Sequence, residues 1–215
     1  MTTDTLHDLR RIVREELRAL RLAELALVQA IHPHADAGDD DNYACTVRLR
    51  DTGAVLSRVP VVATRKGMAA IPDVGDLVLV QFLGGDANAP VITGTLYNDE
   101  DRPPANAEGE AVLRLPSDAA EGEGVELRLN AVAETSAVLN LGASLKLELK
   151  DDDPVVKIDI GDGSAVLTIE SDGTVTIKSG KALVLEGGEV TIKGSTITAE
   201  AQGEMTLKGA VIKLN

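Results

Sequence analysis

The second half of the chain is a run of short segments that are separated by glycines. Aliphatic residues alternate there with Thr and Lys, as in "TVTIKSG" and "EVTIKG", and glycines from 173 to 209 recur every six to nine residues. Because strand side chains alternate between two faces, each segment has one apolar and one polar face. Short strands closed by turns are typical of a β-solenoid or an intertwined β-prism.

The small number of inward-facing residues in each segment decides between those two architectures. Each segment offers only two or three inward residues, and one Phe, two Tyr and no Trp are present in 215 residues. A single wound chain would therefore enclose little apolar volume. Three intertwined chains would bring the inward residues to a threefold axis and use up the strand edges. The predicted trimer core is Val175, Ile177, Val190, Ile192, Met205, Leu207 and Ile212.

Residues 25–98 have a different pattern, with about five strand-like runs separated by Gly, Asp, Asn and Pro. The hairpin "PDVGDLVLVQFLGGDANAPVITGTLYN" places Leu77 and Leu79 on one side of its first strand. Val78, Val80 and Phe82 lie on the other side. Both faces are apolar, which predicts a strand buried on both sides. The length and strand number favour a small barrel of the oligonucleotide/oligosaccharide-binding (OB) type.

The charge argues against a nucleic-acid partner. The formal net charge is -14, and the aromatic residues available for base stacking are Tyr43, Phe82 and Tyr97. The cysteine, Cys45, lies in a strand-like run and is expected to be a buried small hydrophobe. No run of about 20 apolar residues and no secretory signal is evident, so we expect the protein to be made in the cytoplasm.

The N-terminal segment predicts an amphipathic helix, followed by the domains already described. Apolar residues recur in this segment at spacings of three and four, which places them on one side of a helix. This helix either lies on its own domain or meets symmetry mates around an axis. The predicted organisation is a helix over 1–24, an OB domain over 25–98, a linker over 99–110 and a needle over 111–215. The helix stripe is Leu6, Leu9, Val13, Leu17 and Leu20.

Candidate chemical residues are few. His32, His34 and Asp36 would share one side of an extended strand, but Pro33 interrupts it, and a strand-to-loop exit is the better interpretation. The acidic runs 39–41 and 151–153 lack the spaced ligands of a calcium loop, so solvated loops are expected. The sequence predicts no catalytic residue, no cofactor and no metal.

Taken together, the capped helix, the hairpin with "VGDLVLVQFLGGD" and "APVITGTLYN", the acidic linker and the strand repeat resemble the baseplate assembly protein V family. That family comprises the central spikes of contractile phage tails and related injection systems, including type VI secretion spikes. The resemblance implies a homotrimer with an intertwined trimeric β-helix, placed under the tail tube and in contact with baseplate hub proteins. The chain lacks an inserted lysozyme domain and a terminal His-x-His motif, so wall degradation and tip-bound iron are not expected.

The function expected from this resemblance is mechanical. The protein would be a spike component of a phage tail, a tailocin or an extracellular injection particle, transmitting contraction force in membrane puncture and touching the target membrane transiently. The resemblance also implies a tip-capping PAAR-like protein. The alternative is a tail-associated β-helical polysaccharide-degrading enzyme that uses turn carboxylates such as Asp159, Asp162 and Asp172. The expected tip contacts are Ala210, Val211, Ile212, Lys213, Leu214 and Asn215.

Overall fold

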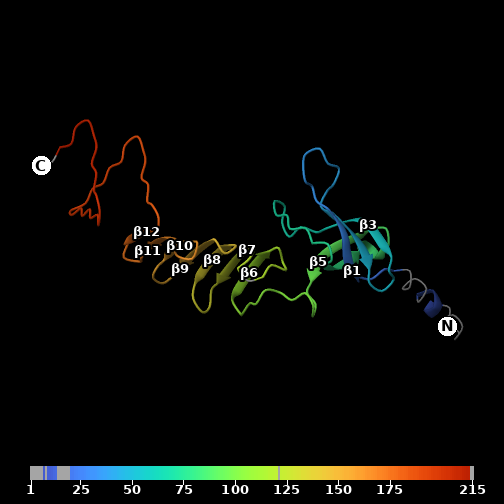
Figure 1. Ribbon diagram of the computed structural model, residues 1–215. Helices are drawn as coiled ribbons and strands as arrows, with labels where there is room; N and C mark the ends of the chain where they lie inside the picture. Colours follow the sequence, from blue (N-terminus) through green and yellow to red (C-terminus); the bar gives the residue numbers. More distant parts are fainter. Residues whose placement is uncertain (1–6, 8, 14–19, 121, 214–215) are drawn as a thin grey trace. The chain divides into compact units, whose positions relative to one another are not determined.

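The computed structural model describes residues 7, 9–13, 20–120 and 122–213, and its regular secondary structure is almost entirely β (Figure 1). His7 and residues 9–13 are helical, and the apolar side chains Leu9, Ile12 and Val13 are about half exposed. Leu6 and Leu17 of the predicted stripe lie outside the described residues. The chain forms two compact units, one of residues 1–108 with 114–119 and the other of 109–113 with 120–215. The boundaries of the four predicted domains stay predictions.

The first unit is a five-stranded antiparallel sheet that curls into a barrel. Hydrogen bonding joins β3 to β2, β2 to β1, β1 to β4 and β4 to β5. A parallel bridge between Val61 and Ile92 connects the two outer strands, and the Val62 N–H donates to the Ile92 carbonyl at 2.9 Å. The strands are β1 (Glu24–His32), β2 (Ala44–Leu49), β3 (Val55–Pro60), β4 (Leu77–Phe82) and β5 (Pro90–Leu96), with a short 3₁₀ turn η1 (Leu83–Gly85).

The barrel interior holds the buried core of this unit. Val78, Val80 and Phe82 of the predicted hairpin are 0%, 0% and 4% exposed, so the predicted burial of their side of the strand is confirmed. Cys45 is fully buried, as predicted, and desolvation raises the pKa of its thiol. Leu77 and Leu79 instead point to the outer face and are only half-buried. The expectation that β4 is buried on both faces is therefore wrong for the single chain, because no second layer of described residues covers its outer side.

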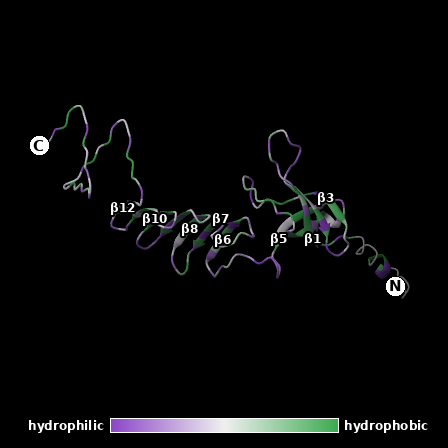
Figure 2. Cartoon of the chain, in the orientation of Figure 1, coloured by the Kyte–Doolittle hydropathy of each residue, from purple (hydrophilic) through white to green (hydrophobic). Residues whose placement is uncertain are grey.

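The second unit begins as a seven-stranded antiparallel sheet in which each strand pairs with its neighbours in sequence. Glycines with positive φ, such as Gly142 (+56°) and Gly173 (+88°), let the chain reverse between strands. Figure 2 shows hydrophobic residues along the strands of both units and hydrophilic residues in many connecting loops. The strands are β6 (Glu110–Leu115), β7 (Val125–Asn130), β8 (Ser136–Leu141), β9 (Leu145–Lys150), β10 (Val156–Ile160), β11 (Ala165–Ile169) and β12 (Val175–Ser179).

Residues 181–213 differ from the expectation of further short strands. The structure describes them as an extended path with bends and without strands, and all of them are exposed. A strand exists only where its backbone groups find a partner, and this segment finds no ladder partner among the described residues. Over 125–179 the strands also pair within one chain, instead of from chain to chain as expected. The intertwined β-helix therefore stays a prediction.

Barrel closure gives a first test. Ile92 is fully buried and its backbone forms the bridge to β3, so Ile92→Ala leaves a cavity at the seam of the barrel. We expect the free energy of unfolding to fall by about 2–5 kcal/mol. Denaturant titration of the full chain measures this effect. Thr95→Ala, at an exposed position of the same strand, is the control, and an equal loss in both variants would contradict the assigned core.

Candidate functional site

The most unusual surface of the second unit is one face of its sheet, which is apolar from β7 to β12. Strand register aligns three rows of side chains across these six strands, because residues two apart in a strand share a face. The central row is Leu127, Leu139, Leu147, Ile158, Leu167 and Ile177; the flanking rows are Val125, Leu141, Leu145, Ile160, Ala165 and Ser179, and Leu129, Ala137, Leu149, Val156, Ile169 and Val175. We call these rows the apolar sheet face.

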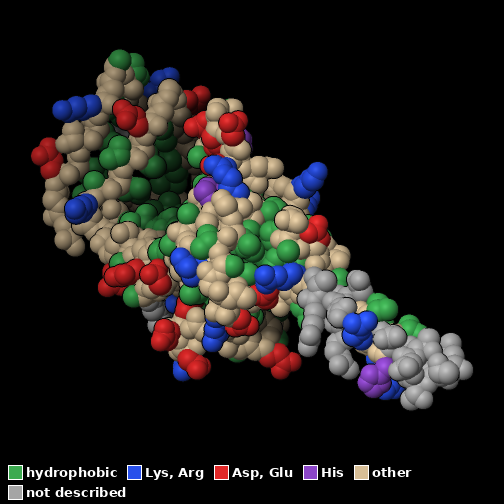
Figure 3. Space-filling model, turned by 90° about the vertical axis from the view of Figure 1, so that its right-hand side faces the viewer, with side chains coloured by type: hydrophobic (Ala, Val, Ile, Leu, Met, Phe, Trp, Pro, Cys, Tyr) green, Lys and Arg blue, Asp and Glu red, His purple; other side chains and the backbone are tan. Residues whose placement is uncertain are grey.

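This face lacks a complete covering layer in the single chain. Leu149, Ile160 and Ile177 are 44%, 48% and 54% exposed, whereas the barrel core is below 10%. Six strands about 4.8 Å apart, each about 17 Å long, give a face on the order of 500 Å². A patch of this size is at the upper end for a protein that remains a monomer. On the face of the molecule that Figure 3 draws, hydrophobic side chains are open to view between charged side chains.

The opposite face of the same sheet is polar and carries paired charges. Lys146 lies opposite Asp159, and Glu148 lies opposite Lys157. Lys146 Nζ is 2.8 Å from Glu148 Oε1, and Lys157 Nζ is 3.1 Å from Asp159 Oδ2. The hydrogen bond from Lys157 is the main reason that the pKa of Asp159 is lowered. Such ion pairs stabilise a fold only slightly, but their charges give this face the polarity that a water-facing surface requires.

The structure places the predicted trimer-core residues in two settings. Val175 and Ile177 lie on the apolar sheet face, opposite Ile169 and Leu167. The others lie in 181–213 and are at least half exposed, away from any strand ladder: Val190, Ile192, Met205, Leu207 and Ile212. The predicted core did not include the rows of β7 to β11, although "VELRLN" and "LKLELK" carry the same alternation. Ala210 to Lys213 of the expected tip contact are exposed, and Leu214 and Asn215 lie outside the described residues.

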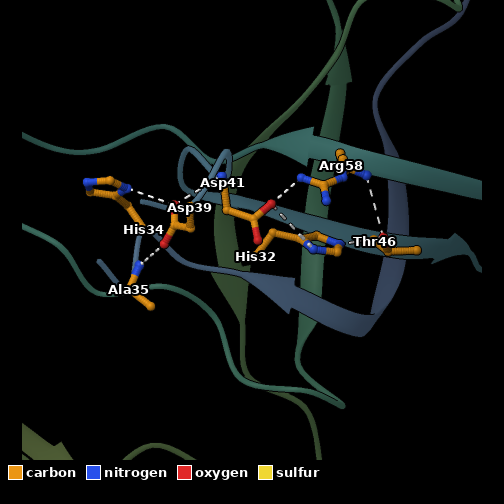
Figure 4. A network of polar contacts seen from close by, with 7 residues as sticks. All are labelled: His32, His34, Ala35, Asp39, Asp41, Thr46 and Arg58. Atoms are coloured by element: carbon orange, nitrogen blue, oxygen red, sulfur yellow. Dashed lines mark hydrogen bonds and ion pairs between the residues drawn. The ribbon is translucent and has the colours of Figure 1, made fainter. Parts of the chain in front are cut away.

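A second candidate site is a polar network at the loop between β1 and β2 (Figure 4). His32 Nε2 is 2.9 Å from Thr46 Oγ1, and His32 Nδ1 is 4.0 Å from Asp41 Oδ1. Asp41 also pairs with Arg58 of β3. His34 and Asp36 have other partners, so the structure does not gather His32, His34 and Asp36 around one point. Among the described residues no cluster of three metal-binding side chains is found.

Asp39 organises the loop that carries His34. Its carboxylate accepts hydrogen bonds from the backbone N–H groups of Ala35 (2.6 Å), Asp36 (3.0 Å) and Asp41 (3.1 Å). His34 Nδ1 lies 2.9 Å from Asp39 Oδ1. These backbone bonds and the His34 ring lower the pKa of Asp39 to about 2, and the same carboxylate raises the pKa of His34. These contacts stabilise the conformation of the loop between β1 and β2.

Three carboxylates of the second unit, Asp153, Asp159 and Asp172, also have structural partners. Asp153 accepts hydrogen bonds from the Ser171 backbone N–H at 2.6 Å and from its hydroxyl at 3.0 Å. Asp172 accepts from the Thr174 N–H at 2.8 Å, which lowers the Asp172 pKa. Asp159 accepts from the Gly163 N–H at 2.7 Å in addition to pairing with Lys157. These contacts stabilise turns between strands.

The His34–Asp39 contact predicts a pH dependence. A raised His34 pKa means that the contact stabilises the loop fully below the ordinary value of 6.5 and is lost as pH rises through the raised pKa. Asp39→Asn should return the His34 pKa toward 6.5, because the charged acceptor is gone. An NMR titration of the imidazole, assigned with His34→Gln, measures this shift. Asp40→Asn, at an exposed neighbour, should leave it unchanged, and equal shifts in both variants would contradict the assignment.

No helix among the described residues has the length and apolarity required to cross a membrane.

Comparison with known proteins identifies residues 45–97 as a match to the type VI secretion system/phage-baseplate injector OB domain. This segment contains β2 to β5 and hence most of the barrel.

Relatives of the chain are spike proteins of Pseudomonas aeruginosa. It is 42% identical over 65 residues to type VI secretion system spike protein VgrG5, which is 30% of this chain and 7% of that protein. It is 34% identical over 76 residues to spike proteins VgrG1a and VgrG1b, which is 34% of this chain and 11% and 9% of those proteins. The matches thus span about a tenth of each relative. The chain contains an injector OB domain and is a relative of the baseplate and central spike family.

Proposed function

We propose that this protein is a homotrimeric structural spike at the baseplate hub of a contractile injection machine. The machine would be a phage tail, a tailocin or an extracellular contractile injection system. The injector OB domain supports the assignment to the hub, and the apolar sheet face carries the proposal of a trimer. The protein would be made in the cytoplasm and built into the assembled particle.

The trimer follows from the need to cover the apolar sheet face. A sheet with one polar and one apolar face requires a second layer against the apolar side. Three copies with these faces turned to a common axis would form a closed prism, with Leu147, Ile158 and Leu167 near its centre. The exposed apolar residues of 181–213 would continue this core, and their unpaired backbone would form ladders between copies as an intertwined β-helix.

The proposed role is mechanical. Bending or compressing such a prism would break many hydrogen bonds and packed contacts together, so it would transmit contraction force to an envelope and contact the target membrane transiently. We assign the chain no catalytic role. The alternative of a polysaccharide-degrading enzyme lacks support, since the aromatic residues Tyr43, Phe82 and Tyr97 all belong to the barrel unit.

The oligomeric state tests this proposal. Leu167→Asp would place three carboxylates in the centre of the proposed prism without partners, at several kcal/mol each. Thr168→Asp, the next residue of β11, lies on the polar face opposite Lys157 and should be tolerated. Light scattering should give about three times 22.5 kDa for the natural chain and Thr168→Asp, and a lower mass for Leu167→Asp. A monomeric natural chain, or two variants that assemble alike, would refute the trimer built on this face.

The second proposed partner is a tip-capping PAAR-like protein that contacts residues 210–215. Val211 and Ile212 are 74% and 50% exposed, so they offer apolar contact area. Removing residues 210–215 should abolish co-purification of the tip protein and leave the mass of the oligomer at three chains, because the upstream sheet remains. Co-purification from assembled particles measures this loss. Retention of the tip protein by the shortened chain would contradict the assigned contact.

A further inference from the structure

Two loops at one end of the barrel enclose an apolar pocket. β1 and β3 end there, and β2 and β4 begin there, so loops 33–43 and 61–76 lie at the same end. Tyr43 joins them, because its hydroxyl accepts from the Ala70 N–H at 2.9 Å and its carbonyl accepts from the Val61 N–H at 3.0 Å. The pocket is about 480 Å³, and its apolar lining is Pro33, Tyr43, Ala63, Met68, Ala69 and Ile71.

The charged side chains that line this pocket are cationic, whereas the acidic residues of the same loops, such as Asp36 and Asp40, are not among its lining. Lys66 lines the pocket and Arg65 is adjacent, and both are exposed. Within the part of the chain that the structure describes, no ion pair is found for either side chain. His34 also lines the pocket, but its charge is balanced by Asp39. A protein of net charge -14 thus offers an apolar pocket with Lys66 in its lining and Arg65 next to it in sequence, which fits an apolar segment flanked by carboxylates.

The linker of this protein has that chemistry. Its sequence "NDEDRPPAN" places three acidic residues, Asp99 to Asp101, ahead of Pro103 and Pro104, with Arg102 between the acidic residues and the prolines. Asn98 holds the acidic part in a fixed turn, because its side-chain oxygen accepts from the N–H groups of Glu100 at 2.8 Å and Asp101 at 2.9 Å. Consecutive prolines favour the polyproline II conformation, which binds in aromatic-lined apolar grooves at low entropic cost.

The linker that reaches this pocket would come from another copy. The linker's own Glu100 and Asp101 line a different hollow with Asp73, Asp76 and Asp118, which shares no lining residue with the Tyr43 pocket. β5 ends at the same end of the barrel as the two loops, so each linker starts at the level of its own chain's pocket. In a cyclic assembly such a contact, pocket of one copy to linker of the next, closes into a ring.

We infer that the Tyr43–Met68 pocket binds the acidic Pro103–Pro104 linker of a neighbouring copy, and that this contact joins the barrels of the proposed trimer into a collar. The inference rests on the proposed oligomer, and it names a contact surface separate from the apolar sheet face. Lys66 and Arg65 would pair with Asp99 and Glu100 across the contact, while Pro103 would lie against Tyr43 and Met68.

Disulfide trapping in the full chain tests this contact. Met68→Cys combined with Pro103→Cys should give covalent bands of two and three chains on a non-reducing gel after mild oxidation; the natural Cys45 is buried. Adding Lys66→Glu should lower the yield several-fold, and adding Glu100→Lys to that variant should restore it. The matched control pairs Met68→Cys with Thr52→Cys, in the turn between β2 and β3 at the other end of the barrel, and should give no ladder.

Light scattering on the same samples distinguishes a failure of the proposed trimer from a failure of the pocket–linker contact. A trimer that gives no ladder, or only a link within one chain, overturns the pocket–linker contact and leaves the proposed spike intact. A ladder that is insensitive to the charge reversal overturns the role of Lys66. A natural chain that is monomeric overturns both the trimer and this contact.

Discussion

The structure of the second unit depends on covering one face of a single antiparallel sheet. Seventeen of the eighteen side chains aligned from β7 to β12 are apolar, Ser179 being the exception. Burying such a face contributes roughly 25 cal/mol per Å² of apolar area, so leaving it in water forgoes the main source of stability for this unit. The opposite face carries charged rows, with Lys146 opposite Asp159, and is therefore the side that can remain in water at low cost.

The two units solve the same problem in different ways. In the first, the bridge from Val61 to Ile92 closes the sheet, so Val47, Val78 and Val80 face inward and lose all or nearly all contact with water. In the second, strand order runs from β12 to β6 without closure, and the apolar side stays open. A closed barrel needs no second layer, whereas an open sheet does. The contrast explains why one unit has a dense core and the other an exposed apolar face.

Much of the barrel could be predicted because its signals are local. Alternation in "LVLVQF" correctly placed Val78, Val80 and Phe82 together on a buried side of the strand, although it did not show that Leu77 and Leu79 on the other side are only half-buried. The run around Cys45 correctly indicated burial. The polar network could not be predicted in the same way. The partners of His32 and His34 are Thr46 and Asp39, and they meet only when β2 and the loop 33–43 fold against β1. In an extended strand, the spacing of His32, His34 and Asp36 would place them on one side. In the folded loop they instead have separate partners.

The repeated segments after residue 174 show that an alternating pattern does not by itself determine whether a strand forms. Val175, Val190 and Met205 are spaced by fifteen residues, and so are Ile177, Ile192 and Leu207. The first copy of this pattern forms β12 beside β11, while the next two copies form no strand. Alternation therefore fixes which residues share a face, but an available backbone edge decides whether a strand forms. After Gly180 the chain keeps the alternation without a ladder among the described residues, and in the proposed trimer the neighbouring copies would supply the missing strand edges.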